Sequence, residues 1–288
     1  MSEVARSLLE NSMAPSARSA NSTLIRPNWP NLPAHVHAIT TTRNDGLSSG
    51  VYGDMNGVAG FNLATHVGDD LQAVLANRTK LNQALPQDVI YLTQIHGSVV
   101  IDAGLRREHC EADACFTTEF DMPCAVLTAD CLPVLFCDRD GTVVAAAHAG
   151  WRGLAEGVLL QTLQQMRMCT DTEISAWMGP AIGAHEFEVG AEVKLAFERS
   201  MGNVDAHFAP SNKSFNKSSN NSANQLQTQE GKYLADIYGL ARQQLRQHGV
   251  EQVYGGDYCT VTQAELFYSY RRDGVTGRMA SLIWMSAK

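Results

Sequence analysis

The sequence has no long apolar run and no concentration of positive charge. No stretch approaches the roughly 18 consecutive apolar residues that a membrane-spanning helix requires, and the first residues lack the apolar core of a signal peptide. The 22 Lys and Arg residues are outnumbered by 30 Asp and Glu residues, and they do not cluster into a basic stripe. These absences argue against a membrane protein and against a nucleic-acid partner, and we expect a cytoplasmic location.

The cysteines form no recognisable disulfide framework. There are seven of them, which is an odd number. They include no C-x-x-C pair, and most lie among apolar residues, as buried reduced thiols do. A cysteine that takes part in chemistry must therefore be distinguished by its surroundings. The sequence also lacks internal repeats and a linker that would divide it into halves.

What is present is enough for one α/β domain. The chain has 288 residues, of which 44% are hydrophobic, so a sizeable core can form. We expect a single layered domain with a mixed β-sheet over residues 24–288, preceded by a disordered leader at 1–23. The stretch 211–229 consists largely of Asn and Ser, is too polar to bury a core and is predicted to be a mobile surface insertion.

The spacing of apolar residues predicts the main elements of this domain. Short apolar or alternating runs predict strands, and apolar residues that recur every three to four positions predict helices. Strands are expected at 36–41, 89–94 and 174–178, and helices at 71–81, 154–168, 189–199 and 233–248.

The stretch 125–153 predicts a β-hairpin that leads into a helix. Two apolar runs flank an Asp-Gly turn at 140–141, and a Gly-Trp-Arg-Gly turn follows the second run. With this turn, Pro133 lies opposite His148, and Cys131 lies one diagonal step away on the same face, roughly 7–8 Å distant at Cα. A slip of one residue would place the two side chains on opposite faces. The pattern thus predicts that Cys131 and His148 are neighbours.

Three residues could form a catalytic metal site. His96 follows a predicted strand and precedes a glycine, Cys131 follows the polar Asp130 in an apolar run, and His148 stands at a strand end. Catalytic zinc sites have three protein ligands and one open position, and this set supplies that number. Each residue alone also fits an ordinary place in the core, and Cys131 with His148 also fits a nucleophile and its base.

Arginines beside turns are candidate anion contacts. The turn 150–153 joins a strand to a helix, where Arg152 and backbone N–H groups could bind an anion, or where Arg152 could simply form a salt bridge. Arg43 lies in a polar loop, and Arg272 and Arg278 lie in a loop near the C-terminus. The local sequence does not distinguish among these arginines.

Longer motifs follow one another along the chain: TQIHG, TADCLPVLF, AAAHAGWRGL, MGPAIG, FEVG, YGGDYCT and SYRRDGVTGRMASLIW. Over about residues 40–285 they closely resemble the YfiH-type laccase-domain family, which is named for polyphenol oxidation and now regarded as a family of purine nucleoside phosphorylases. The resemblance implies that His96, Cys131 and His148 bind a zinc or copper ion. It also implies a fold similar to that of cysteine hydrolases with a Cys and His pair.

The resemblance further implies phosphate-dependent cleavage of adenosine, inosine and methylthioadenosine, with adenosine deamination and weak polyphenol oxidation as side activities. The expected partners are a purine nucleoside and phosphate, and the candidate contacts are Arg43, Asn62, Arg152 and Arg272. Phosphorolysis agrees with the residues, because attack of phosphate at the sugar carbon requires a site that holds an anion and stabilises a departing base. The oligomeric state is not predicted.

Two other functions fit the same residues. A hydrolase with Cys131 and His148 as nucleophile and base could cut an amide in a cytoplasmic peptidoglycan precursor. A non-catalytic zinc-binding module could instead act through a protein partner, but structural zinc sites normally have four protein ligands. Multicopper oxidase chemistry is poorly supported, because it requires several H-x-H pairs and the sequence has one, at 35–37.

Overall fold

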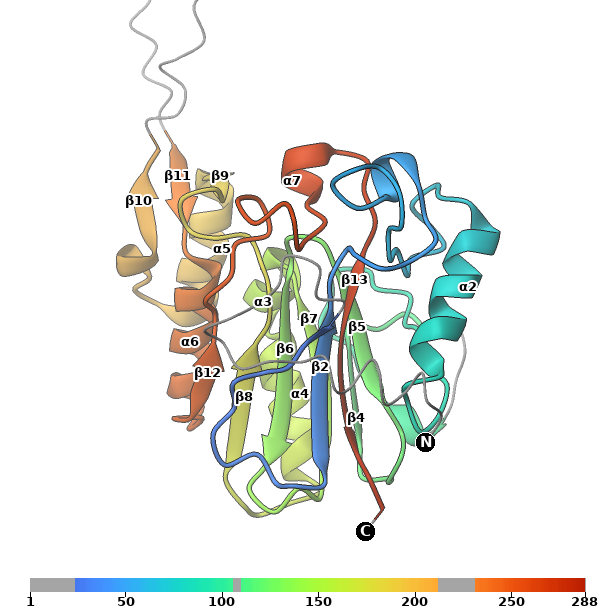
Figure 1. Cartoon of the computed structure of the whole chain (residues 1–288). Helices are drawn as coiled ribbons and strands as arrows, with labels where there is room; N and C mark the ends of the chain where they lie inside the picture. Colours follow the sequence, from blue (N-terminus) through green and yellow to red (C-terminus); the bar gives the residue numbers. More distant parts are fainter. Residues whose placement is uncertain (1–23, 106–109, 212–230, 288) are drawn as a thin grey trace, which may run out of the picture.

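The computed structural model describes residues 24–105, 110–211 and 231–287. The predicted leader at 1–23 lies outside these residues, as does the predicted insertion at 211–229 except for Ser211. Within the described chain, two β-sheets stack face to face at the centre of the molecule (Figure 1).

The larger sheet has six strands in the order β12-β8-β6-β7-β4-β3, and the smaller has four in the order β1-β2-β13-β5. A three-stranded sheet of order β10-β11-β9 is separate from both. The larger sheet is mixed, as predicted, because β3 with β4 and β12 with β8 are parallel and its other pairs are antiparallel. The strands are β1 (Leu24–Ile25), β2 (Val36–Thr41), β3 (Val100–Asp102), β4 (Ala114–Thr117), β5 (Cys124–Thr128), β6 (Leu132–Asp138), β7 (Val144–Ala149), β8 (Ile174–Met178), β9 (Glu188–Gly190), β10 (Phe208–Pro210), β11 (Lys232–Ala235), β12 (Val253–Gly255) and β13 (Met279–Met285).

Helices cover the outer faces of the two stacked sheets. They are α2 (Leu71–Asn82), α3 (Trp151–Glu156), α4 (Val158–Arg167), α5 (Ala191–Met201), α6 (Ile237–Gln247) and α7 (Tyr270–Asp273). Short 3-10 helices occur at Gly50–Tyr52, Ala103–Leu105 and Asp205–His207. In the part of the chain that the structure describes, none of the helices has both the length and the apolar character that crossing a membrane requires.

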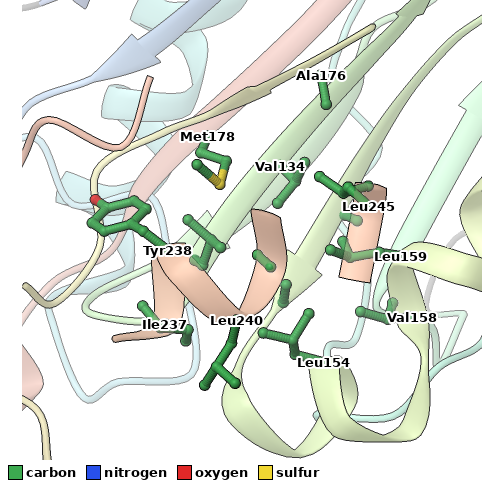
Figure 2. Close-up of a cluster of buried hydrophobic side chains, with 14 of the residues drawn as sticks. Val134, Leu154, Val158, Leu159, Ala176, Met178, Ile237, Tyr238, Leu240 and Leu245 are labelled. Atoms are coloured by element: carbon green, nitrogen blue, oxygen red, sulfur yellow. The ribbon is translucent and has the colours of Figure 1, made fainter. Parts of the chain in front are cut away.

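The apolar stripes of α3, α4 and α6 pack on the larger sheet (Figure 2). Leu154, Leu159 and Leu245 from these helices are fully buried in one cluster with Val134 of β6 and Met178 of β8. On the other side, α2 packs on the smaller sheet through Leu81, which shares a cluster with residues of β2 and β13. The result is a helix–sheet–sheet–helix stack in which both central sheets are buried on both faces.

The β6–β7 hairpin has the register predicted from the sequence. Pro133 lies opposite His148 in the antiparallel ladder. The tight turn runs from Asp138 to Gly141, whose N–H donates to the Asp138 carbonyl oxygen at 3.1 Å and whose φ is 66°. The turn is therefore centred one residue earlier than predicted, but the pairing of the strands is unchanged.

Two predicted elements are wrong in detail. Residues 89–94 form no strand and make one isolated bridge, between Thr93 and Glu111. The helix predicted at 154–168 begins earlier, at Trp151, and is divided at Gly157, whose φ of 93° interrupts helical geometry. Apolar periodicity continues through such a break, so the sequence pattern did not reveal it.

The helices predicted at 189–199 and 233–248 begin later than expected, at Ala191 and Ile237. The chain before α5 forms β9, and the chain before α6 forms β11, and these two strands pair with each other. Short strands that pair across a long sequence separation carry little local signal, so their residues were assigned to the following helices.

Candidate metal centre

Three ligand-bearing side chains converge at one edge of the stacked sheets, where β6 begins and β7 ends. The ligand atoms of His96, Cys131 and His148 all lie within 4.8 Å of one another. His96 Nε2 lies 3.8 Å from Cys131 Sγ, and the two imidazole rings meet edge to face with centroids 4.8 Å apart. Within the described residues this is the only group of three or more His, Cys, Asp or Glu side chains placed to share an ion.

Strand alternation places Cys131 beside His148. Leu135 of β6 and Ala146 of β7 pair directly and face the smaller sheet. Two residues further along each strand, Pro133 and His148 pair on the same face, and Cys131 lies two residues beyond Pro133. The two side chains predicted to share a face therefore do so, at the edge of the interface between the sheets.

Asp130 fixes the backbone immediately before Cys131. Its φ is 89°, a strained value for a residue with a side chain. Its carboxylate accepts hydrogen bonds from Thr260 Oγ1 at 2.5 Å and from the Arg271 N–H at 2.6 Å, and its carbonyl oxygen accepts one from the Ile182 N–H at 2.9 Å. The polar residue that was out of place in an apolar run thus ties two loops and the helix α7 to the start of β6.

His96 lies in a loop that is held from two sides. On one side, the Gln94 side-chain amide forms two hydrogen bonds with the backbone of Leu127 in β5, as a neighbouring strand would. Its Nε2 donates to the Leu127 carbonyl at 2.8 Å, and its Oε1 accepts from the Leu127 N–H at 2.7 Å. His96 itself has a φ of 62°. This left-handed backbone turns the imidazole toward Cys131.

Asp113 is the residue that sequence reasoning missed. It is fully buried, and its Oδ1 accepts from His148 Nδ1 at 2.7 Å and from the His96 N–H at 2.9 Å. Its Oδ2 accepts from the N–H groups of Gly97 at 2.7 Å and Ile95 at 3.2 Å. One carboxylate thus positions two of the three candidate ligands. The sequence feature that could have identified Asp113 is an acidic residue between two alanines at the start of an apolar run. Asp130 was noted for the same reason, as a polar residue in an apolar run.

Two glycines make room for this cluster. A Cβ at Gly150 would lie 3.0 Å from both Cys131 Sγ and His96 Cδ2, and a Cβ at Gly153 would lie 2.6 Å from the Gly97 carbonyl oxygen. The Gly-Trp-Arg-Gly turn, for which the sequence left an anion site and a simple turn open, therefore packs against the loop of His96. The helix that it starts, α3, has only six residues.

The cluster favours separated charges in the metal-free protein. Burial opposes ionisation of the Cys131 thiol, but His148 and His96 outweigh burial and lower the thiol pKa to about 6. Burial likewise opposes protonation of His148, but Cys131 and Asp113 raise its pKa to about 9. Burial also opposes ionisation of Asp113, and the hydrogen bonds from His148, Gly97 and His96 lower the pKa of this carboxyl overall.

The donor set fits a metal ion. Two imidazoles and a thiolate are typical zinc ligands, and Asp113 on His148 Nδ1 is the carboxylate–histidine arrangement that orients a metal-bound imidazole. The distance of 3.8 Å from His96 Nε2 to Cys131 Sγ is close to the roughly 3.6 Å edge of a tetrahedral zinc site with bonds of about 2.1 and 2.3 Å. Three protein ligands leave one position for a substrate.

A pocket of about 370 Å³ opens directly onto the three ligands. Small-molecule sites have volumes of roughly 300–1,000 Å³, so a nucleoside-sized compound is within range. None of the residues that line the pocket is Asp or Glu, and its one arginine is Arg278. The lining residues are His66, Leu92, Gln94, His96, Leu127, Thr128, Ala129, Cys131, His148, Tyr270 and Arg278.

Arg43 and Arg272, two predicted phosphate contacts, are not among these lining residues. The Arg43 side chain is buried and donates to the carbonyl oxygens of Gly53 and Ala264. The Arg272 guanidinium donates to the carbonyl oxygens of Thr260, Val261 and Phe267 and to the Asp273 carboxylate. Both guanidinium groups bridge backbone carbonyls of neighbouring segments and have a structural role outside the pocket.

Asn62 and Arg152 also lie outside the pocket lining. Asn62 is fully buried, and its Oδ1 accepts from the backbone N–H groups of Arg278 and Ala64. It therefore positions the backbone of the pocket arginine. The Arg152 guanidinium stacks over the Trp151 ring at 4.4 Å, a contact that differs from both the anion site and the salt bridge considered for it from the sequence.

Comparisons with known proteins agree on one family. Residues 37–286 match the family described as multi-copper polyphenol oxidoreductase laccase. The chain is 46% identical over 268 residues to a protein of Escherichia coli K12 named purine nucleoside phosphorylase YfiH, covering 92% of this chain and 99% of that one. It is 44% identical over 262 residues to a purine nucleoside phosphorylase of Haemophilus influenzae, covering 90% and 98%.

Solved structures show the same fold. A Neisseria meningitidis protein of the DUF152 family matches with a TM-score of 0.79 and 45% identity, over 92% of this chain and all of that one. YlmD from Geobacillus stearothermophilus matches with a TM-score of 0.75 and 28% identity, over 94% and 98%. Taken with the family match and the His/Cys/His cluster, these likenesses show that the chain belongs to the laccase-like YfiH family.

Proposed function

We propose that the chain is a metal-dependent purine nucleoside phosphorylase. It would cleave adenosine, inosine and methylthioadenosine with phosphate, giving the free base and the sugar 1-phosphate. The observation that carries this proposal is the shared pocket, in which the three candidate metal ligands and the guanidinium of Arg278 line one cavity without a carboxylate. The names of the two bacterial relatives above support the same reaction.

Phosphorolysis makes distinct demands on a site. The attacking phosphate carries negative charge, the sugar develops an oxocarbenium-like character, and the purine leaves as an anion that takes up a proton. A pocket that holds a cation and excludes carboxylates suits the anion. The apolar side chains of Leu92, Leu127 and Ala129 limit water around the reacting carbon, and Tyr270 offers a ring for stacking on a purine.

His96, Cys131 and His148 are the residues that would hold zinc, or alternatively copper. When bound, such an ion supplies a Lewis acid beside the substrate. The hydrogen bond from His148 Nδ1 to Asp113 fixes the tautomer in which Nε2 faces the other ligands. Gln94 and Asp113 hold the loop of His96 in place.

An assay panel tests the proposal. Purified protein of defined zinc or copper content is incubated with inosine, adenosine or methylthioadenosine, with and without phosphate, and the products are separated by chromatography. We expect a sugar 1-phosphate only when phosphate is present, and its loss in Cys131→Ser. The same samples report adenosine deamination and catechol oxidation, the side activities that the family resemblance implies. If no sugar 1-phosphate forms at any metal content, phosphorolysis is wrong.

A second candidate function is amide hydrolysis. It is favoured by the arrangement of three side chains, in which Cys131 interacts with His148 and His148 is hydrogen-bonded to Asp113. A thiol of lowered pKa beside an imidazole that a carboxylate orients is the arrangement of cysteine hydrolases. A peptidoglycan-precursor nucleotide with an amide-linked peptide is the test substrate. Hydrolysis would proceed without metal and stop when zinc occupies Cys131, whereas phosphorolysis would require the metal-loaded protein. A non-catalytic zinc module would show neither reaction.

A further inference from the structure

The wall of the pocket formed by the ends of β5 and β13 carries an incomplete hydrogen-bonding site. Thr128, the last residue of β5, is 2% exposed, and its hydroxyl has no hydrogen-bond partner among the described residues. Buried hydroxyl groups almost always have a partner, so a polar atom from a ligand or water is expected here. Thr128 lines the pocket, so a ligand in the pocket is the candidate partner.

Strand alternation points Thr128 toward the metal ligands. In β5, Cys124 and Val126 face the larger sheet and belong to the cluster between the two sheets. Thr128 lies two residues beyond Val126, so its side chain is on the same face of β5. It lies at the edge where Cys131 and His148 project from the other sheet. The hydroxyl and the candidate metal ligands therefore lie on facing walls of the pocket.

Arg278 lies next to Thr128 and is only partly satisfied. Met279, the following residue, pairs with Thr128 across β13 and β5. The Arg278 Nη1 donates to the carbonyl oxygens of Thr276 and Gly277 at 2.9 and 3.0 Å, and its backbone N–H donates to Asn62. Among the described residues, no acceptor is found for Nε and Nη2. These two groups form the side of the guanidinium that binds an oxyanion with two parallel hydrogen bonds.

The charge around this wall favours an anion. The pKa of His66, which lines the pocket, is lowered mainly by burial and further by the positive charges of Arg278 and Arg78. This histidine therefore lies close to two guanidinium groups. Arg78 is itself held by the Leu63 carbonyl and by the ring of Tyr91, and neither neutralises its charge. No carboxylate lines the pocket. The negative groups that act on Arg278 are Cys131, which is a candidate metal ligand, and Asp130, which already accepts hydrogen bonds from Thr260 and Arg271. The wall therefore keeps positive charge for an anion.

We propose that Arg278 and Thr128 together bind the attacking phosphate, with Nε and Nη2 of Arg278 and the Thr128 hydroxyl donating to its oxygens. This proposal rests on the proposed phosphorolysis and adds the place of the phosphate within the pocket. Phosphate on this wall faces the metal ligands, so the nucleoside sugar lies between the two. Asn62 acts as a positioning residue for Arg278, which explains its complete burial at a predicted substrate-binding position.

The test separates binding of phosphate from binding of nucleoside. For the metal-loaded wild type, Arg278→Gln, Arg278→Lys, Thr128→Val and Thr128→Ser, KM is measured separately for phosphate and for inosine. The rise in Tm caused by inorganic phosphate is measured without nucleoside. Matched controls are Arg139→Gln, an exposed arginine at the opposite end of the hairpin, and Thr162→Val, a buried threonine within α4.

We expect Arg278→Gln to raise KM for phosphate roughly 10- to 100-fold and Thr128→Val to raise it roughly tenfold, as for lost hydrogen bonds to a charged group. KM for inosine should change less than threefold, and the phosphate-induced rise in Tm should shrink in both variants. Thr128→Ser should restore the wild-type values. Arg278→Lys should be intermediate, because it keeps the charge and loses the paired donors. Thr128→Val should fold normally, because the hydroxyl it removes has no partner.

Two results would overturn the assignment: an unchanged KM for phosphate in both variants, or a rise confined to KM for inosine. Failure of the reaction itself is distinguishable. If wild-type protein forms no sugar 1-phosphate but phosphate raises its Tm, and this rise disappears in Arg278→Gln and Thr128→Val, the phosphate site stands and phosphorolysis is wrong. If phosphate neither reacts nor raises the Tm, both proposals fail.

Discussion

Replacing Asp113 with asparagine should damage both the stability and the metal affinity of the protein. In the structure one buried carboxylate accepts hydrogen bonds from the His148 ring and from three backbone N–H groups in the loop of His96. Asparagine keeps the shape but turns one acceptor oxygen into an NH₂ donor. That donor would face either the ring N–H or the loop N–H groups, so at least one buried donor would lose its partner.

The size of the effect follows from the burial of the group. Removing one partner from a buried charged pair costs about 3–5 kcal/mol of unfolding free energy, which for a chain of this size lowers Tm by roughly 6–20 °C. Loss of a carboxylate that orients a metal-bound histidine weakens metal binding by about 10- to 100-fold. Zinc affinity is measured by competition with a chelator, and Tm by circular dichroism of the metal-free protein.

Asp138→Asn is the matched control. Asp138 is also a buried aspartate with several hydrogen bonds, from Thr142, Thr170 and Thr172, but it lies at the opposite end of the β6–β7 hairpin. Its substitution should lower Tm and leave zinc affinity unchanged. If Asp113→Asn binds zinc as tightly as Asp138→Asn does, the idea that Asp113 positions the ligands is refuted.

Three further predictions concern the same edge of the sheets. Gly150→Ala should weaken zinc binding by about tenfold or more, measured by chelator competition, because the new methyl group would lie 3.0 Å from Cys131 Sγ; unchanged affinity would mean that the ligands can shift freely. In metal-free protein, alkylation of Cys131 by iodoacetamide, followed by peptide mass spectrometry, should show a midpoint near pH 6. In His148→Ala this midpoint should rise toward the ordinary thiol value of about 8.5, and a wild-type midpoint near 8.5 would contradict the charged pair. Arg43→Gln should lower the unfolding free energy by about 2–4 kcal/mol in a denaturant titration, because it leaves buried carbonyl oxygens unpaired, and should change KM for phosphate by less than twofold; a large rise in that KM would return Arg43 to the substrate site.

The part of the site on the β6–β7 hairpin could be predicted from the sequence. A tight turn and strict strand alternation fix which side chains share a face, so the pairing of Pro133 with His148 and the position of Cys131 followed from local pattern alone. His96 could be proposed only by residue type and by resemblance. Its loop is placed by Gln94 and Asp113, which act across the sheets and leave no periodic signal.

The arginines show the limit of this reasoning. Arginine beside a turn is compatible with binding an anion and with bridging loop carbonyls, and the difference depends on which acceptors the fold brings near. Arg43 and Arg272 meet backbone carbonyls from distant segments, whereas Arg278 lines the pocket and has two donor groups without an acceptor among the described residues. No local pattern distinguishes these cases, because the deciding contacts are tertiary.

The hydrogen bonds that hold the ligands have a consequence for which metal the protein carries. Asp113 and Gln94 fix the loop of His96 without help from an ion, so the site is preorganised and binding a metal costs little conformational entropy. Such a site can exchange its ion without unfolding. Imidazole and thiolate ligands accept zinc and copper alike, and copper has the higher intrinsic affinity in the Irving–Williams series. The ion bound in a cell is then determined by metal supply, so protein produced under zinc-rich and copper-rich conditions should differ in metal content and not in fold.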